Sequence, residues 1–277
     1  MEPVNRRYHV AKAKGCESTT HRVCAVDQSG RRQQLPVVDE VPLTLKVDGI
    51  EIVRLMTLGN HPQALALGYL RNQGLIDKIE EIASVAVDWE NETVNVVTRK
   101  STGRRHSLKP SSIRTVTSSC GQGTVFDQTL DALYRYSLPE VSIRQSTIYA
   151  LLREIIRHNR IYQTAGSVHG CGLCRESALL LFVEDVGRHN AADAIAGRMW
   201  LDGIPGEDKI LYTTGRLTSE IILKTAQMRI PVLLSRSGIT YLALEMAQDF
   251  GLIVIGRAKG LRHLIYNGAE NVIFDAL

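Results

Sequence analysis

"KILYTTGRLTSEIILKTAQMRIPVLLSRSGITYLALEMAQDFGLIVIGRA", residues 209–258, decides the fold of this chain. Three short apolar runs, "ILYTT", "VLLS" and "IVIG", alternate with two stretches, "LTSEIILKTAQM" and "GITYLALEMAQDF", whose apolar residues recur at helical spacing. Upstream, "ALLLFVED" and "NAADAIAGRMWL" extend the same alternation of strand and helix. This alternation predicts an α/β fold in which helices cover both faces of a mostly parallel sheet, giving three layers.

The first half of the chain follows a different pattern. "VPLTLKVDGIEIVRLMTL" predicts a hairpin that turns at Asp48 and Gly49, and "HPQALALGYLRNQGLI" predicts a helix between Pro62 and Gly74. "IASVAVDWENETVNVVTRK" predicts two further strands. We therefore expect four parts: a flexible arm at residues 1–30, an α+β domain at 31–115, a cysteine loop and linker at 116–140, and a C-terminal α/β domain at 141–277.

Composition limits the classes of partner. Of 277 residues, 44% are hydrophobic, which is typical of a globular protein, and the net charge of +4 is spread along the chain. A small anionic ligand is therefore a better prediction than a nucleic-acid polymer. The N-terminus lacks an apolar signal region and no stretch is apolar enough to span a membrane, so we expect a cytoplasmic protein whose five cysteines are at least partly reduced.

Basic and glycine-containing loops follow the predicted strands of the second half. In open α/β sheets ligands bind at the carboxyl ends of the strands, so Arg188, Arg216, Arg236 and the segment "RAKGLR" predict an anion-binding edge. The alternative is that these arginines are solvated loop charges. "EDVGRH", residues 184–189, is likewise either an acid–base group or a hydrogen-bonded structural corner.

Two cysteine motifs carry possible chemistry. "HGCGLC", His169 to Cys174, has the C-x-x-C spacing of zinc and redox sites, but zinc deaminases need a glutamate two residues after the histidine, where Cys171 stands. Packing cysteines are the better interpretation, and no metal is expected. In "TSSCGQGTVFD", Cys120 lies in a polar, glycine-rich stretch that predicts an accessible thiol, either a nucleophile or sulfur carrier or a chance loop cysteine.

Taken in order, "DEVPLTLKVDGI", "LALGYLRNQGLI", "SSCGQG", "TAGSVHG", "VEDVGRHNAADAI", "TTGRLTSEI", "SRSGITYLALEMA" and "VIGRAKGLR" resemble the FdhD family over residues 38–266. The resemblance implies a sulfur carrier that accepts persulfide sulfur from an IscS-type cysteine desulfurase. Such a carrier passes the sulfur to the molybdenum cofactor, bis(molybdopterin guanine dinucleotide), before that cofactor enters the formate dehydrogenase apoenzyme. Cys120 matches the first cysteine of the family's C-G-x-C loop, whereas Gly123 replaces the second.

The resemblance also implies a ligand site, a fold and an assembly. It implies a cytidine deaminase-like C-terminal domain and a homodimer. The arginines and glycines of the basic loops in turn predict that GDP or GTP binds as a partial mimic of the cofactor. The alternatives are a cofactor chaperone without sulfur transfer and a zinc-dependent hydrolase using His169, Cys171 and Cys174. The residues expected to hold the cofactor are Arg188, Arg216, Arg236, Arg257, Ala258, Lys259, Gly260, Leu261 and Arg262.

Overall fold

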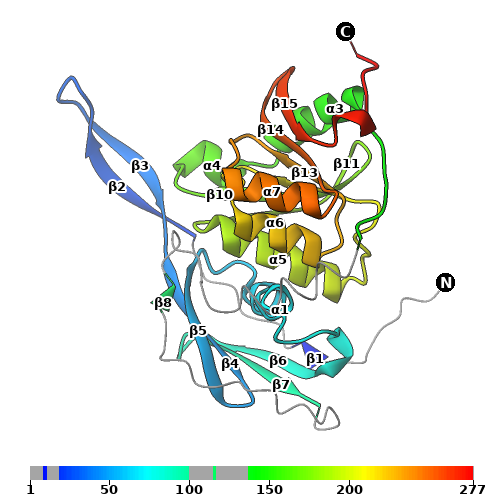
Figure 1. Cartoon of the computed structure of the whole chain (residues 1–277). Coiled ribbons are helices and arrows are strands. Elements are labelled where there is room, and N and C mark those ends of the chain that lie inside the picture. The colour runs from blue at the N-terminus through cyan, green and yellow to red at the C-terminus, as the bar shows by residue number, and fades with distance from the viewer. Residues whose placement is uncertain (1–8, 11–18, 100–114, 117–136, 277) are drawn as a thin grey trace.

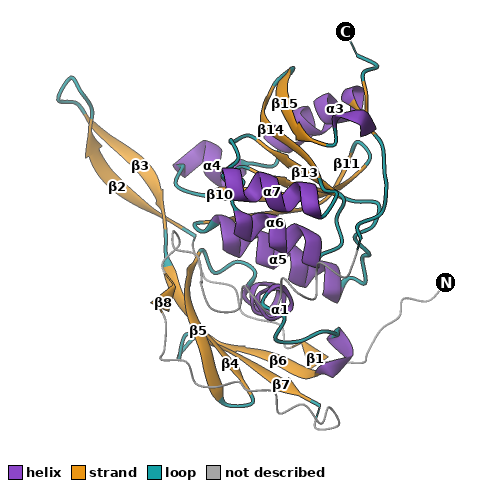
Figure 2. Ribbon diagram, in the orientation of Figure 1, coloured by secondary structure: helices purple, strands orange, loops and turns teal. Residues whose placement is uncertain are grey.

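The computed structural model describes residues 9–10, 19–99, 115–116 and 137–276. It is a mixed α/β structure with two six-stranded sheets, and helices lie between and around them (Figure 1, Figure 2). Within the described residues, no helix has the length and apolar character required to cross a membrane.

The first sheet belongs to the N-terminal half and has the strand order β1-β6-β7-β4-β5-β8. The predicted hairpin is confirmed, since β4 and β5 are antiparallel and Asp48 and Gly49 have φ of 50° and 83°. Both φ values are positive, as the tight turns of two-residue hairpins require. The elements are β1 (His9–Val10), β4 (Val41–Val47), β5 (Ile50–Thr57), α1 (Pro62–Asn72), a 3₁₀ turn at Ile79–Glu81, β6 (Ile82–Asp88), β7 (Thr93–Thr98) and β8 (Thr115–Val116).

A separate hairpin, β2 (Thr20–Val26) and β3 (Arg32–Val38), projects away from both sheets in Figure 1. Its two strands pair along their whole length. One strand lies before residue 30 and the other after it, where the sequence pattern predicts the boundary between the arm and the α+β domain. Residues 20–26 are thus ordered by strand pairing.

The second sheet has the order β11-β10-β12-β13-β14-β15. The strands and helices of this half are β9 (Ile143–Arg144), α3 (Gln145–Ile156), α4 (Arg160–Ala165), β10 (His169–Arg175), β11 (Ala178–Asp185), α5 (Arg188–Leu201), β12 (Ile210–Thr213), α6 (Ser219–Gln227), β13 (Val232–Ser235), α7 (Tyr241–Asp249), β14 (Ile253–Lys259), β15 (Arg262–Asn267), a 3₁₀ turn at Ala269–Asn271, and β16 (Val272–Ile273).

The expectation of a mostly parallel sheet is wrong. Only the pairs β12–β13 and β13–β14 are parallel, whereas β10 is antiparallel to both neighbours and β15 is antiparallel to β14. The reason lies in two tight turns: Glu176 and Gly260 have φ of 49° and 62°, and each lets the chain return as an adjacent strand without a crossover helix.

Apolar residues of the central strands alternate between the two faces of this sheet. Leu211, Leu233 and Val254 belong to the core under α5, α6 and α7, while the next residues along each strand belong to the core that α3 covers. Helices therefore lie on both faces, as three layers require. The detailed cytidine deaminase-like assignment stays a prediction.

The two halves share one hydrophobic core through the contact of α1 with α5. The helices approach so closely at two glycines that a Cβ on Gly68 would lie 1.7 Å from the carbonyl oxygen of Asp193, and one on Gly197 would lie 1.8 Å from that of Ala64. Only glycine permits this backbone contact, which fixes the position of the N-terminal sheet against α5.

Candidate functional site

Loops at the carboxyl ends of β12, β13 and β14 are hydrogen-bonded to one another. Leu217 N donates to Gly238 O at 2.9 Å, and Arg257 N donates to Ser237 O at 2.9 Å. Because backbone hydrogen bonds join these loops, they form one connected edge of the sheet. We call this set of loops, together with the start of α5, the basic edge.

Three of the predicted arginines lie on the basic edge in different environments. Arg188 is the first residue of α5 and is only 9% exposed, and its stem packs against Gly215, where a Cβ would come within 2.8 Å of Arg188 Cδ. Arg216 and Arg236 are exposed, and the Arg236 guanidinium carbon lies 5.9 Å from the centre of the Tyr162 ring. Arg188 is therefore not a solvated loop charge, whereas Arg216 and Arg236 are exposed both to solvent and to any ligand at this edge.

Residues 257–262, which the family resemblance implies to be a loop, form a β-hairpin instead. Arg257 and Lys259 end β14, Gly260 and Leu261 form the turn, and Arg262 begins β15. The side chain of Ala258 is buried, so of these six residues it is the one that cannot present its side chain to a ligand. The other five are exposed along the hairpin.

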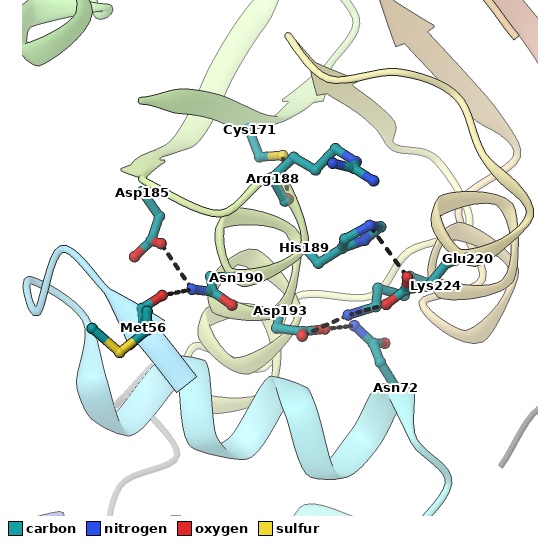
Figure 3. A network of polar contacts seen from close by, with 10 residues as sticks. All are labelled: Met56, Asn72, Cys171, Asp185, Arg188, His189, Asn190, Asp193, Glu220 and Lys224. Atoms are coloured by element: carbon teal, nitrogen blue, oxygen red, sulfur yellow. Dashed lines mark hydrogen bonds and ion pairs between the residues drawn. The ribbon is translucent and has the colours of Figure 1, made fainter. Parts of the chain in front are cut away.

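Behind the basic edge lies a buried polar network that the sequence patterns do not reveal (Figure 3). Lys224 Nζ is 2.6 Å from Asp193 Oδ2 and both side chains are 3% exposed, while Asn72 Nδ2 donates to Asp193 Oδ1 at 2.7 Å. This network joins α1, α5 and α6. Lys224 resembles an ordinary charge of an amphipathic helix in the sequence, so only the packing of three helices reveals its burial.

His189 connects this network to the basic edge. Its Nε2 lies 3.2 Å from Glu220 Oε2, and its side chain is 13% exposed. Burial, together with the positive charges of Lys224, Arg188, His169 and Arg216, lowers the pKa of His189 to about 2. His189 is therefore neutral at physiological pH and is not a base that cycles between charge states.

The acidic residues of "EDVGRH" are structural. Glu184 accepts hydrogen bonds from the backbone N–H groups of Ile161 and Tyr162, both at 2.9 Å, at the start of α4. Asp185 accepts four hydrogen bonds, including one from Leu58 N at 3.1 Å that ties β11 to the N-terminal half, and burial raises its pKa against the effect of these donors. The interpretation as a structural corner thus accounts for both carboxyl groups.

Cys171 and Cys174 lie on β10 and point to opposite faces of the sheet. Cys171 belongs to the core under α5, whereas Cys174 belongs to the core under α3. Both are 0% exposed, and burial raises the pKa of each thiol to about 12. A spacing of three residues on a strand separates the side chains, so these two thiols cannot bind one zinc ion or form a disulfide together.

His169 lies at the start of β10, on the same side as the basic edge. Its Nδ1 is 3.3 Å from Thr214 Oγ1, and burial together with the charges of Arg188 and Arg216 lowers its pKa. Across the described ranges, no group of three metal-ligating side chains converges. Cys120 and Gly123 lie outside the described residues, so the predicted role of Cys120 stays a prediction.

Comparisons with known proteins agree with the fold and with the motifs. The sulfur carrier protein FdhD of Bacillus pumilus is 32% identical over 237 residues, 85% of this chain and 90% of its own length. The protein of the same name from Bacillus subtilis is 30% identical over 239 residues, 85% of this chain and 90% of its own length.

A crystal structure from Desulfotalea psychrophila, described as a formate dehydrogenase accessory protein, superposes with a TM-score of 0.73 at 25% identity. The superposition covers 92% of this chain and 98% of the other. A sequence profile of the FdhD/NarQ family matches residues 38–273, so the chain belongs to the FdhD/NarQ family.

Proposed function

We propose that this chain is a cytoplasmic sulfur carrier for the maturation of formate dehydrogenase. The observation that carries the proposal is the family match over residues 38–273, because the curated relatives are sulfur carrier proteins. In detail, sulfur passes from a cysteine desulfurase of the IscS type to Cys120, and from Cys120 to bis(molybdopterin guanine dinucleotide) before its insertion into the apoenzyme. We also propose that the carrier is a homodimer.

The first step needs one accessible thiolate. The Cys120 thiolate attacks the terminal sulfur of the donor persulfide, a new S–S bond forms, the donor S–S bond breaks, and the donor cysteine leaves as a thiolate. No external oxidant or reductant enters this exchange. A second loop cysteine is therefore not required, which is compatible with glycine at position 123.

Thiol burial supports this assignment. Cys171 and Cys174 are fully buried with pKa values raised to about 12, so they neither reach a donor protein nor ionise at physiological pH. Cys24 is exposed on the projecting hairpin and is the described thiol that competes with Cys120 for the role. It lies outside the segment that matches the family.

The charge of the basic edge supports cofactor binding. Phosphate groups favour guanidinium and ammonium donors, which Arg188, Arg216 and Arg236 and the hairpin at 257–262 supply near the carboxyl ends of the strands. We expect GDP or GTP to bind here as partial mimics of the cofactor. A cofactor chaperone without sulfur transfer would use the same edge but would not require a persulfide.

The test is mass spectrometry after incubation with a cysteine desulfurase and cysteine, combined with formate dehydrogenase activity in a host that lacks its own carrier. We expect added sulfur on Cys120, and we expect Cys120→Ser to abolish maturation while GDP binding persists. Cys24→Ser is the matched control and should retain full activity. Activity retained in Cys120→Ser would refute the sulfur-carrier mechanism, and if no residue gains sulfur, the chaperone function replaces it.

A further inference from the structure

A cavity of about 550 Å³ lies at the end of the second sheet opposite the basic edge. It contacts Ile210 and Val232, the first residues of β12 and β13, whereas the basic edge follows the last residues of these strands. Its other walls come from the start of α3, the turn between β10 and β11, and the small sheet of β9 and β16. The cavity is therefore separate from the cofactor site proposed above, and its volume is typical of small-ligand sites.

Lys209 is the buried charge of this cavity. Its side chain is 4% exposed, and its Nζ contacts the carboxylate of Asp208, which also lines the cavity. An ammonium group has three N–H donors, and among the described residues Asp208 is the acceptor that they meet. Buried donors that lack an acceptor cost free energy. The cavity therefore favours a ligand that carries acceptor oxygens.

The charges beside Lys209 favour a single negative charge on that ligand. Arg175 Nε lies 2.8 Å from Asp208 Oδ2, so the Asp208 carboxylate contacts two cations. The hydrogen bond from Lys209 and the charges of Lys209 and Arg175 lower the pKa of Asp208, which keeps it ionised. Glu176 also lines the cavity, but it is exposed and water screens its charge. Two positive groups therefore share one buried negative group, and a monoanion balances them.

Arg144 supplies further donors at the cavity. Its side chain is exposed, and its Nη1 lies 3.5 Å from Asp275 Oδ2. The Asp275 carboxylate also accepts hydrogen bonds from the backbone N–H and the hydroxyl of Ser146, at 2.9 and 2.8 Å. The guanidinium has five N–H donors, so it retains donors for a ligand carboxylate.

Apolar side chains form much of the remaining wall. Ile143, Ile210 and Val232 belong to the core that α3 covers, and Ile273 of β16 lines the cavity with 42% of its surface exposed. A strongly hydrated anion such as sulfate gains nothing from these side chains. A ligand with an apolar body removes its own apolar surface and theirs from water.

We propose that this cavity binds an apolar monocarboxylate. The carboxylate contacts Lys209 and Arg144. The apolar body packs against Ile143, Ile210 and Val232. Neither the persulfide nor the basic edge takes part, so this inference goes beyond the proposed function and does not rest on it.

Two sources carry this chemistry: a free short-chain acid, and the carboxyl-terminal residue of a peptide. Val141 and Ser142 line the cavity, and their backbone groups make no backbone hydrogen bond within the described ranges. These groups can pair with the backbone of a peptide, whereas a free acid has no backbone to offer. The experiment therefore includes both kinds of ligand.

Hexanoate and hexanamide are the first probes, because they share an apolar body and differ in charge. We expect NMR of the isoleucine methyl groups in the full chain to show that hexanoate shifts Ile143, Ile210 and Ile273, and leaves Ile239 of the basic edge unchanged. Sodium chloride at equal ionic strength is the control. Hexanoate should bind about tenfold more tightly than hexanamide, because charge on both partners strengthens the hydrogen bond. Equal affinities, or no shift of the three cavity methyls, would overturn the proposal.

Substitution of Lys209 tests the carboxylate contact. Lys209→Met should weaken hexanoate about ten- to hundredfold and bring its affinity close to that of hexanamide. Asp208 is half-exposed and keeps its contact with Arg175, so the variant leaves no buried carboxylate unpaired. Lys78→Met, which removes an exposed lysine from the first half of the chain, should change neither affinity. If Lys209→Met lowers the melting temperature but leaves the ratio of the two affinities unchanged, Lys209 is structural and the proposal is overturned.

Arg144→Met is the second variant, should Lys209→Met not fold, because the Arg144 side chain is exposed. It should also weaken hexanoate more than hexanamide, and an unchanged ratio would refute the carboxylate contact.

A tripeptide of leucine with an acetylated amino terminus then identifies the source. If it binds more tightly than hexanoate and loses affinity when its carboxyl terminus is amidated, the ligand is a peptide terminus. If hexanoate binds more tightly, the ligand is a free acid. A tripeptide that binds equally well with and without its free carboxylate would contradict the proposal. These measurements use neither a sulfur donor nor a nucleotide, so their outcome is independent of the sulfur-transfer assay.

Discussion

Gly68→Ala should destabilise the chain although alanine favours helices. The added Cβ would lie 1.7 Å from the carbonyl oxygen of Asp193, and both atoms belong to helix backbones that have no rotamer to change. Restoring a separation of 3.0 Å requires α1 to move away from α5 by about 1.3 Å. A shift of that size would break the 2.7 Å hydrogen bond from Asn72 to Asp193.

The magnitude follows from three contributions. Overpacking costs about 1–3 kcal/mol, and a buried acceptor that loses its donor costs about 1–3 kcal/mol. The higher helix propensity of alanine offsets about 1 kcal/mol of this loss of stability. The net loss is about 3 kcal/mol, which corresponds to a decrease in melting temperature of about 6–12 °C for a chain of this size class.

The assay is thermal unfolding followed by circular dichroism, with Gly238→Ala as the control. A Cβ at Gly238 would meet only Arg257 Nε at 3.8 Å, an ordinary contact, so its effect should stay within about 0.5 kcal/mol. If Gly68→Ala melts at or above the temperature of the parent, the close contact between α1 and α5 is not the feature that joins the two halves.

Three further predictions concern buried groups. Lys224→Met should lower the free energy of unfolding by about 3–5 kcal/mol in urea titrations, because it strands a buried carboxylate; a loss below about 1 kcal/mol would contradict the burial of the pair. A thiol reagent followed by peptide mapping should label Cys24 in the native chain, and Cys171 and Cys174 only after unfolding; native labelling of either buried thiol would contradict their placement on β10. The folded-state pKa of His189 is about 2, so below pH about 6.5 the unfolded chain binds one more proton than the folded chain. The free energy of unfolding should therefore fall by about 1.4 kcal/mol for each unit that the pH decreases below this value. His189→Gln should reduce the slope of the measured pH–stability curve by that amount, and an unchanged slope would contradict the burial of the ring.

Local patterns in the sequence were sufficient for several elements. The turn at Asp48 and Gly49 and the helix that begins at Pro62 depend on neighbouring residues, and both are confirmed. The strand–helix alternation after residue 178 is confirmed for the same reason, since each apolar run has its own period.

Features set by distant contacts could not be predicted in this way. "HGCGLC" has two glycines and no β-branched residue, so nothing local marks it as strand β10, which its neighbours β11 and β12 stabilise by pairing on both sides. Lys224 occupies a helical position that is normally exposed, and only the approach of α1 and α5 buries it. Of the nine residues predicted to hold a cofactor, the structure distinguishes buried Arg188 and buried Ala258 from the exposed remainder, a difference that spacing does not encode.

The division of the β10 thiols between two faces has a consequence for oxidative damage. A persulfide at the proposed site, Cys120, would react with any thiol that it could reach; the reaction would form a dead-end disulfide and release the carried sulfur as sulfide. Cys171 and Cys174 are shielded from that side reaction by separate layers of packed side chains. Two additional cysteines are therefore compatible with a persulfide on the same chain, because neither thiol can react with it. The exposed Cys24 lies on a hairpin that projects away from the rest of the molecule in Figure 1.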